Sequence, residues 1–248
     1  MASIANVEYV LFDMDGLLLD SEAIYTKVTN TILAPYGKEM TWDIKAGCMG
    51  KPEKEAAVYL LSFFPDIDLT VPAYLEQRNR LQDELWPTVT LLPGARKLIL
   101  HLKAHNISMA VATSSRRRNF QLKTGHLGDT FDLFGGKVVC GDDTQYNMRG
   151  KPQPDIFLVA ARELLGRDVG AVDGVDVTAA QLAERRKGLV FEDALLGMQA
   201  GKRAGMSVVW VPDTQLLTVE YSGEEKADQT LKSLEEFVPE QWGLPPYA

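Results

Sequence analysis

The chain has 248 residues, two cysteines and a formal net charge of −8. This length allows one or two domains with a sizeable core, and the acidic balance argues against a nucleic-acid polymer as partner, because a phosphate backbone is bound by a basic surface. Two cysteines make no disulfide framework, and the sequence shows neither a signal peptide nor an apolar run of spanning length. We therefore expect a cytoplasmic protein that does not act at a membrane.

The apolar run at residues 7–12 predicts a first buried strand, which ends in Asp13, Met14, Asp15 and Gly16. Side chains two residues apart in an extended segment point the same way, so Asp13 and Asp15 are expected to converge just past the strand end. Open α/β sheets bind ligands at that edge. Paired carboxylates there suit a hard cation such as Mg²⁺, and one of them could attack phosphorus while the other moves protons. For this motif taken by itself, an acidic turn without function is the alternative.

A block without strand patterns follows, from about residue 20 to residue 92. Its helical stretches are broken at residues 35–37, 47–52 and 65–72. A helical block of this length between the first two strands indicates an inserted domain. We therefore expect an α/β core formed by residues 1–20 and 93–248, and a helical domain formed by residues 21–92. Lys51, in a loop of the helical block, is either a substrate contact or an ordinary exposed lysine.

The second apolar run, residues 107–112, ends in Thr113, Ser114 and Ser115. Their hydroxyl groups and the following amides can donate to a phosphoryl oxygen, or they can simply cap the next helix. Arg116 and two further arginines come directly afterwards. In an acidic chain, a phosphorylated substrate requires a local positive site, and these arginines are candidates for it, although some of them are expected to face solvent.

Two later segments add a lysine and two more acids. Lys151 lies in a loop whose prolines restrain the backbone before a helix that begins near Asp155, so its ammonium group lies either over an anion or in solvent. The apolar run at residues 188–191 ends in Glu192 and Asp193, which repeats the pattern of the first strand. Four carboxylates from two strand ends would form a plausible Mg²⁺ site.

Strand and helix signals alternate through the rest of the chain, which predicts a parallel sheet covered by helices. Residues 166–187 depart from this alternation and form a predicted surface insertion, with a helix for which Thr178 is the candidate N-cap. His101 and His105 lie four apart on a predicted helix. They could be a zinc pair, but without a third ligand nearby we favour a solvated helix face.

Taken together, Asp-x-Asp, Thr, Lys and Glu-Asp occur in this order at strand ends or in loops, and the sequence resembles the phosphatase branch of the haloacid dehalogenase superfamily. The resemblance implies a Rossmann-like α/β core, an inserted α-helical cap domain and dependence on Mg²⁺. It also implies that Asp13 is the nucleophile that forms an aspartyl-phosphate and that Asp15 is the general acid and base. The predicted site comprises Thr113, Ser114 and Lys151 for phosphate, Lys51, Ser115 and Arg116 for the rest of the substrate, and Asp13, the backbone carbonyl of Asp15, Glu192 and Asp193 for the metal.

A narrower resemblance covers nearly the whole chain apart from the insertion. Residues 12–22, 49–51, 112–115, 141–143 and 237–247 look like the eukaryotic pseudouridine-5′-phosphatase group. This similarity implies a phosphatase of a small phosphorylated metabolite, either pseudouridine 5′-phosphate or a related nucleotide or sugar phosphate. We expect the chain to act as a monomer. Relatives with similar motifs act on glycerol phosphate or flavin mononucleotide, so the leaving group stays open.

Three other functions share parts of this pattern. A β-phosphoglucomutase-like phosphomutase usually carries a His soon after the Asp-x-Asp motif and an Arg in the cap loop, whereas this chain has Tyr25 near the first position and Lys51 as the cation in that loop. A receiver-like phospho-switch would lack both an acid at Asp15 and a helical domain of this size. A haloacid dehalogenase proper would need neither the second aspartate nor a metal site.

Overall fold

A computed structural model of the chain describes all residues except 1–5, 49–52, 172–175, 214, 216–220 and 248. The chain divides into two compact units, one formed by Met1–Leu19 with Leu91–Ala248 and the other by Asp20–Thr90. The first unit has a parallel sheet with helices, which confirms the predicted α/β class, and the described part of the second unit is helical. The division falls one or two residues before the expected boundaries at 20 and 92. That the second unit is a cap domain stays a prediction.

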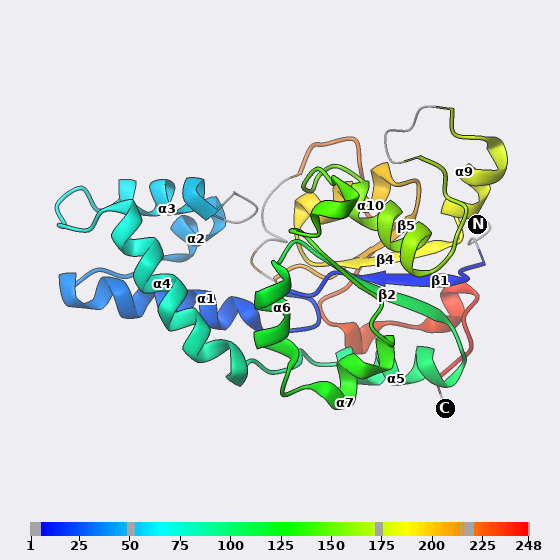
Figure 1. The fold of residues 1–248 in the computed structure, drawn as a ribbon, viewed down its shortest axis with the longest axis horizontal. Helices are drawn as coiled ribbons and strands as arrows, with labels where there is room; N and C mark the ends of the chain where they lie inside the picture. The colour runs from blue at the N-terminus through cyan, green and yellow to red at the C-terminus, as the bar shows by residue number, and fades with distance from the viewer. Residues whose placement is uncertain (1–5, 49–52, 172–175, 214, 216–220, 248) are drawn as a thin grey trace. The chain divides into compact units, whose positions relative to one another are not determined.

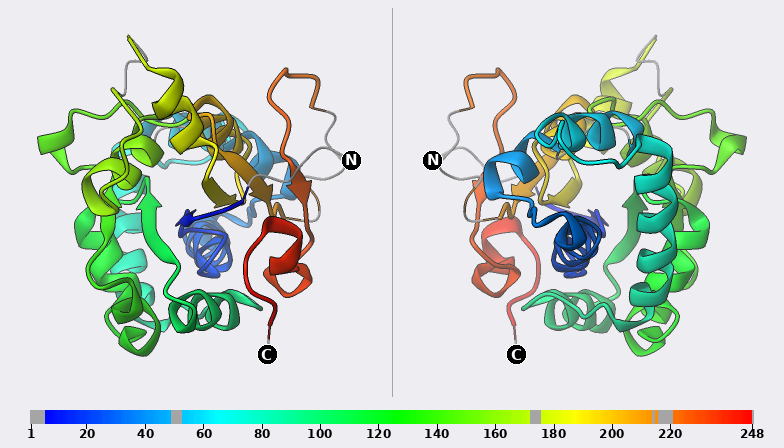
Figure 2. Two further views of the ribbon diagram at one scale, coloured as in Figure 1. Left: turned by 90° about the vertical axis from the view of Figure 1, so that its right-hand side faces the viewer. Right: turned by 90° about the vertical axis from the view of Figure 1, so that its left-hand side faces the viewer.

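The α/β unit contains a parallel six-stranded sheet in the order β3-β2-β1-β4-β5-β6. Figure 2 (left) shows this order in colour, from green β2 through blue β1 and yellow β4 to orange β6. The central strands are fully buried, as expected for apolar runs in a sheet covered on both faces. The strands are β1 Tyr9–Phe12, β2 Ser108–Thr113, β3 Val138–Cys140, β4 Gly188–Glu192, β5 Ser207–Trp210 and β6 Gln229–Thr230.

Helices cover both faces of this sheet. In Figure 1, α10 lies above the sheet, and α5 and α7 lie below it. On one face, Tyr9 and Leu11 belong to an apolar cluster that includes residues of α8 and α10. On the other face, the ring of Phe12 packs against Phe134 and Phe191. The helices are α5 Ala95–Ala104, α6 Arg117–Thr124, α7 Gly128–Phe131, α8 Asp155–Val159 with a π-helical turn at Ala160–Leu164, α9 Ala179–Arg185 and α10 Leu195–Arg203.

The helical unit is built from α1 Ser21–Leu33, α2 Trp42–Cys48, α3 Glu53–Ser62 and α4 Val71–Leu85, with 3₁₀ turns at Ala34–Tyr36 and Trp86–Thr88. The side chain of Asp20 caps α1 by accepting from the amide of Ala23. Helices α1 and α4 are joined by a buried hydrogen bond of 3.0 Å between the hydroxyl groups of Thr29 and Tyr74. Trp86 is buried in the core of this unit, and the half-buried ring of Tyr25 packs edge to face on it.

The described part of the insertion at residues 166–187 is anchored more firmly than a surface loop. Thr178 caps α9, as predicted, and Gln181 completes a capping box. Arg185 on the same helix is buried and donates to the carbonyls of Val169 and Ala171 at 2.6 and 2.9 Å. These bonds hold the segment before the helix against the helix itself.

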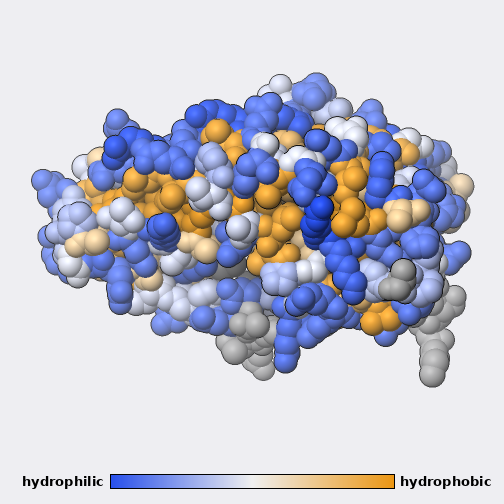
Figure 3. Space-filling view, turned by 90° about the horizontal axis from the view of Figure 1, so that it is seen from below, coloured by the Kyte–Doolittle hydropathy of each residue, from blue (hydrophilic) through white to orange (hydrophobic). Residues whose placement is uncertain are grey.

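The expectation of a solvated histidine pair on α5 is wrong for His101. His101 is buried, and its Nε2 lies 2.9 Å from the carbonyl oxygen of Pro245, because the C-terminal segment crosses this helix and places the ring of Tyr247 against the imidazole, with the two rings tilted by 56°. Figure 3 shows apolar side chains gathered in patches among polar ones on the face seen from below. Apolar atoms contribute much of the surface of folded proteins. In the described part of the chain, no helix is long and apolar enough to cross a membrane.

Candidate active site

Two strand ends bring three carboxylates to one edge of the sheet. Asp13 directly follows β1, Glu192 ends β4, and Asp193 comes next. The amide of Asp13 donates to the carbonyl of Phe191 at 3.0 Å, so the pairing of β1 with β4 continues beyond β1. These two strands are neighbours in space although β2 and β3 separate them in the sequence. At such a switch point, an open α/β sheet forms its ligand-binding crevice.

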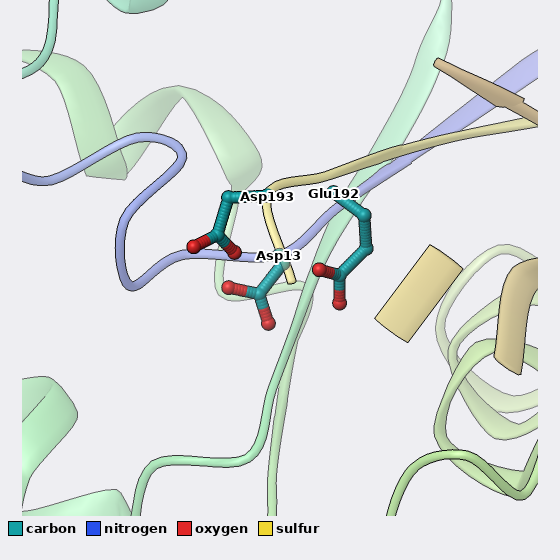
Figure 4. Close-up of side chains that lie close together, drawn as sticks. All are labelled: Asp13, Glu192 and Asp193. Atoms are coloured by element: carbon teal, nitrogen blue, oxygen red, sulfur yellow. The ribbon is translucent and has the colours of Figure 1, made fainter. Parts of the chain in front are cut away.

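The carboxylates of Asp13, Glu192 and Asp193 form an acidic cluster. Their ligand oxygens all lie within 4.8 Å of one another, and all three side chains are buried. Figure 4 shows the three side chains close together at the strand ends. Several carboxylates cannot share a buried space without compensating positive charge, so the cluster requires a cation, a proton or both.

Lys151 supplies part of that positive charge. Its Nζ lies 2.5 Å from Oδ1 of Asp13 and 2.6 Å from Oε1 of Glu192, and only 9% of its side chain is exposed. Burial by itself would lower the pKa of Lys151, but the two carboxylates raise it above its ordinary value. The lysine is therefore charged and bridges the ends of β1 and β4.

The loop that carries Lys151 is fixed by an ion pair that the sequence interpretation missed. Asp155, the first residue of α8, is buried and accepts from the amide, Nε and Nη2 of Arg149 at 2.9, 3.0 and 2.8 Å. Burial favours a higher pKa for Asp155, but these bonds hold the pKa below its usual range. The pairing of Arg149 with Asp155 thus joins the chain before Lys151 to the chain after it.

The carboxyl group of Asp13 has a strongly perturbed pKa. Burial raises the pKa of Asp13 to about 7, the nearby charges of Glu192 and Asp15 act in the same direction, and Lys151 opposes them. Perturbed carboxyl groups of this kind are characteristic of functional sites. A cation that binds beside Asp13 would favour its ionised form.

Asp15 lies near the cluster but is held by different partners. Its Oδ1 accepts from Nζ of Lys123 at 2.5 Å and its Oδ2 from the hydroxyl group of Ser115 at 2.7 Å. The chain turns sharply here, since Gly16 has a φ of 76° and the amide of Leu19 returns to the carbonyl of Met14. The turn ends the strand geometry on which the expected convergence of Asp13 and Asp15 depended. The two residues remain close enough for the charge of Asp15 to act on Asp13.

The polar residues after β2 have distinct environments. Thr113 is buried at the end of β2, and its hydroxyl group accepts from the amide of Ser115 at 3.0 Å. Ser114 and Arg116 are exposed, and Arg117 pairs with Asp143 at 2.5 Å, so the charge of Arg117 is locally compensated. Lys51, the predicted contact from the helical unit, lies outside the described residues.

Two residues near the site, Lys123 and Gly197, were not predicted from the sequence. Lys123 occupies an inward position on α6, three residues after Phe120, which packs on Phe131. A lysine at the spacing of an apolar face could have indicated a buried partner. Gly197 on α10 lies so close to Glu192 that an added Cβ would meet its carboxylate. No sequence pattern indicates this contact, because it joins a helix to the preceding strand end.

Fold and site together define a doubly wound α/β protein with an acidic site at the switch point of its sheet. Known proteins specify this class further. A profile of haloacid dehalogenase-like hydrolases matches residues 10–211. The chain is 42% identical over 243 residues to (DL)-glycerol-3-phosphatase 2 of Arabidopsis thaliana, which covers 98% of this chain and 93% of that protein. It is 38% identical over 242 residues to a probable pseudouridine-5′-phosphatase of Drosophila melanogaster, covering 98% and 96%.

The fold also matches a solved structure. A haloacid dehalogenase family hydrolase from Deinococcus radiodurans R1, whose crystals hold phosphate and sodium, superimposes with a TM-score of 0.73 at 24% identity, covering 98% of this chain and 99% of that one. The chain belongs to the haloacid dehalogenase-like hydrolases. The predicted family, its phosphatase branch and the similarity to pseudouridine-5′-phosphatases are confirmed, and the identity to a glycerol-3-phosphatase is higher, at 42% against 38%.

Proposed function

We propose that the chain is an Mg²⁺-dependent phosphatase that hydrolyses small phosphomonoesters through an aspartyl-phosphate on Asp13. The observation that carries the proposal is the buried cluster of Asp13, Glu192 and Asp193 around the ammonium group of Lys151, at the switch point of the sheet. A cluster of this kind pairs a carboxylate nucleophile with positive charge for the phosphoryl oxygens.

The reaction consists of two displacements. A carboxylate oxygen of Asp13 attacks phosphorus, the bond from phosphorus to the alcohol oxygen breaks, and Asp15 donates a proton to that oxygen. Asp15 then takes a proton from water, which attacks the phosphorus, releases inorganic phosphate and restores Asp13. Thr113, Ser114 and Lys151 hold the phosphoryl oxygens during both steps.

The donor set fits a hard divalent cation. Carboxylate oxygens are the ligands that Mg²⁺ prefers, and one lysine compensates only one of the three acids of the cluster, which leaves two negative charges when all three are ionised. Both oxygens of Glu192 are engaged, Oε1 by Lys151 and Oε2 by the amide of Ala194 at 3.0 Å. We therefore assign metal binding mainly to Asp13, Asp193 and the backbone carbonyl of Asp15, with Glu192 in a supporting place. The bound ion would offset the negative charge that a phosphate dianion brings to this site.

The substrate class follows from what the named relatives share. Glycerol 3-phosphate and pseudouridine 5′-phosphate differ in size, but both are phosphate esters of a primary alcohol on a hydroxyl-rich carbon chain or sugar. We propose such esters as substrates, acted on by a monomer in the cytoplasm. Lys51 and Arg116 are the proposed contacts to the rest of the substrate, whereas the hydroxyl group of Ser115, which the sequence also suggested for this role, donates to Asp15.

A phosphomutase is not supported by the environment of Tyr25. This residue stands near the position where the mutases that the chain resembles carry a histidine, and its ring packs on the buried Trp86. Tyr25 is a packing residue of the helical unit, and it brings no imidazole for proton transfer.

The test measures release of inorganic phosphate from glycerol 3-phosphate, glycerol 2-phosphate and pseudouridine 5′-phosphate, with and without Mg²⁺. We expect hydrolysis of the two primary esters, slower hydrolysis of glycerol 2-phosphate and loss of activity in Asp13→Asn. Asp129→Asn, which removes an exposed carboxylate paired with Arg96, is the matched control. Near-normal turnover of Asp13→Asn, or no hydrolysis of any of these esters by the intact chain, would overturn the proposal.

A further inference from the structure

A second buried lysine lies behind the site. Lys123 on α6 is fully buried, and its Nζ lies 2.5 Å from Oδ1 of Asp15 and 3.1 Å from the hydroxyl oxygen of Ser115. Ser115 in turn donates to Oδ2 of Asp15 at 2.7 Å. Each oxygen of the Asp15 carboxyl group therefore has a partner, and these two partners contact each other. The three side chains form a closed triangle of hydrogen bonds.

The two lysines of the site differ in what they can reach. The side chain of Lys123 has no exposed surface, whereas the side chain of Asp15 is 20% exposed. Lys123 thus contacts the carboxyl group from the protein interior, while part of the Asp15 side chain is exposed to solvent. A group without exposed surface cannot contact a phosphate ester that arrives from solvent. Lys123 can therefore act on the reaction through Asp15 and Ser115, which it contacts directly.

Burying an ammonium group is costly unless a well-placed partner compensates for it. On a surface helix such as α6, a lysine that faces solvent would carry no such cost. The burial of Lys123 thus requires a compensating partner, and the carboxyl group of Asp15 is one.

We propose that Lys123 is a positioning residue which, together with Ser115, fixes the carboxyl group of Asp15 in the orientation that delivers a proton to the leaving alcohol oxygen. This inference rests on the proposed phosphatase function. No bond to Lys123 forms or breaks in the reaction, and the proton passes from Asp15 to the alcohol oxygen as its bond to phosphorus breaks. The ammonium group of Lys123 binds one oxygen of the carboxyl group and the hydroxyl group of Ser115 binds the other. With both oxygens held, the carboxyl group has little freedom to rotate.

Substrates with different leaving groups can distinguish a positioning role of Lys123 from a merely structural one. Departure of glycerol from its phosphate requires a proton, because an alkoxide is strongly basic, whereas p-nitrophenolate leaves without one. A displaced Asp15 therefore slows hydrolysis of glycerol 3-phosphate much more than hydrolysis of p-nitrophenyl phosphate. General damage to the site slows both alike. The ratio kcat/KM is the appropriate quantity, because it covers steps only up to departure of the leaving group, and breakdown of the aspartyl-phosphate does not enter it.

The experiment compares both esters in the intact chain, in Lys123→Met, which keeps the length of the side chain without its charge, and in Ser115→Ala. General acid catalysis contributes about 10² to 10⁴-fold, so in Lys123→Met we expect a loss of about 100-fold on glycerol 3-phosphate and of less than about fivefold on p-nitrophenyl phosphate. Ser115→Ala should show the same selectivity with a loss of about tenfold on the glycerol ester. Lys103→Met, at an exposed position of α5, is the matched control and should change neither ratio.

Equal losses on the two esters in Lys123→Met would overturn the proposal. If Lys123→Met does not fold, as judged by circular dichroism and its melting temperature, Ser115→Ala decides, and equal losses there would overturn it as well. Failure of the phosphatase proposal would look different, because the intact chain itself would then hydrolyse neither ester.

Discussion

Gly197 provides a sharp test of how the helix after β4 shapes the acidic cluster. In α10, a Cβ at this position would lie 1.7 Å from Oε1 of Glu192 and 1.9 Å from its Cδ, far inside van der Waals contact. Gly197→Ala must therefore displace the carboxylate of Glu192 or lift α10 away from the strand. Both movements break the contacts that Glu192 makes with Lys151 and with the amide of Ala194.

The expected magnitude is a balance of two terms. Replacing glycine by alanine inside a helix stabilises it by about 1 kcal/mol. Breaking a buried charge pair destabilises a protein by about 3–5 kcal/mol, because one charge is left uncompensated. The clash forces this loss, since Glu192 has no exposed surface and its carboxylate cannot move into solvent. The free energy of unfolding should therefore fall by about 2–4 kcal/mol. Lys151 also loses an anchor, so turnover should fall at least about tenfold.

Gly201→Ala is the matched control, because it lies on the same helix and its added Cβ would meet Val208 at 2.7 Å and Val190 at 3.3 Å. Overpacking of this kind costs about 1–3 kcal/mol and involves no charged group, so turnover should stay within about twofold. Urea unfolding and kcat on glycerol 3-phosphate, both measured where the variants are folded, give the two quantities. A Gly197→Ala variant that is more stable than the intact chain and has normal turnover would contradict this reasoning, because it would show that the site does not depend on the space left by the glycine.

Three further predictions concern the cation, the loop and the substrate. Chelation of divalent ions should abolish hydrolysis, and Asp193→Asn should raise the Mg²⁺ concentration needed for half-maximal activity; unchanged activity after exhaustive chelation would contradict this. The pKa of Asp155 is held low, so the ionised carboxylate contributes to stability at neutral pH, and this contribution is lost as the pH falls through the folded pKa. Asp155→Asn should therefore lower the free energy of unfolding in urea by about 2 kcal/mol at pH 7, and this difference should shrink towards pH 3. Arg116→Ala should change relative kcat/KM for pseudouridine 5′-phosphate against glycerol 3-phosphate by about ten- to a hundredfold, and an equal loss on both would assign Arg116 to the phosphate.

The strands next to the site were predictable because a completely buried strand appears in the sequence as a continuous apolar run. The apolar runs at residues 7–12, 107–112 and 188–191 correspond to β1, β2 and β4 within two residues at each end. Each run ends where polar side chains begin, and that change marks the functional edge of a parallel sheet. The short strands β3 and β6 carry no comparable run, and their presence depends on pairing with strands already formed.

The partners of Asp15 could not be predicted, because strand alternation holds only while the chain stays extended. The turn at Gly16, with a φ of 76°, redirects the backbone, and Asp15 meets Lys123 more than a hundred residues further along the chain. Predicting this contact would require the packing of α6 against the first loop. The family resemblance assigned a role to Asp15 without indicating what holds it in place.

The two buried lysines and the proposed cation would all compensate the negative charge of the same four carboxylates. Asp13, Asp15, Glu192 and Asp193 together bring four negative charges when ionised, and Lys123 and Lys151 bring two positive ones, which leaves a surplus of two. A phosphate dianion would add two more in a low-dielectric site. Without a cation, the cluster reduces its charge by holding a proton, in agreement with a pKa of about 7 for Asp13. A protonated carboxyl group is a poor nucleophile, so in the proposed mechanism a bound divalent cation would do more than attract the substrate, because it would also favour the ionised form of Asp13. Neither lysine can take over this part, since both already serve as partners of the aspartates.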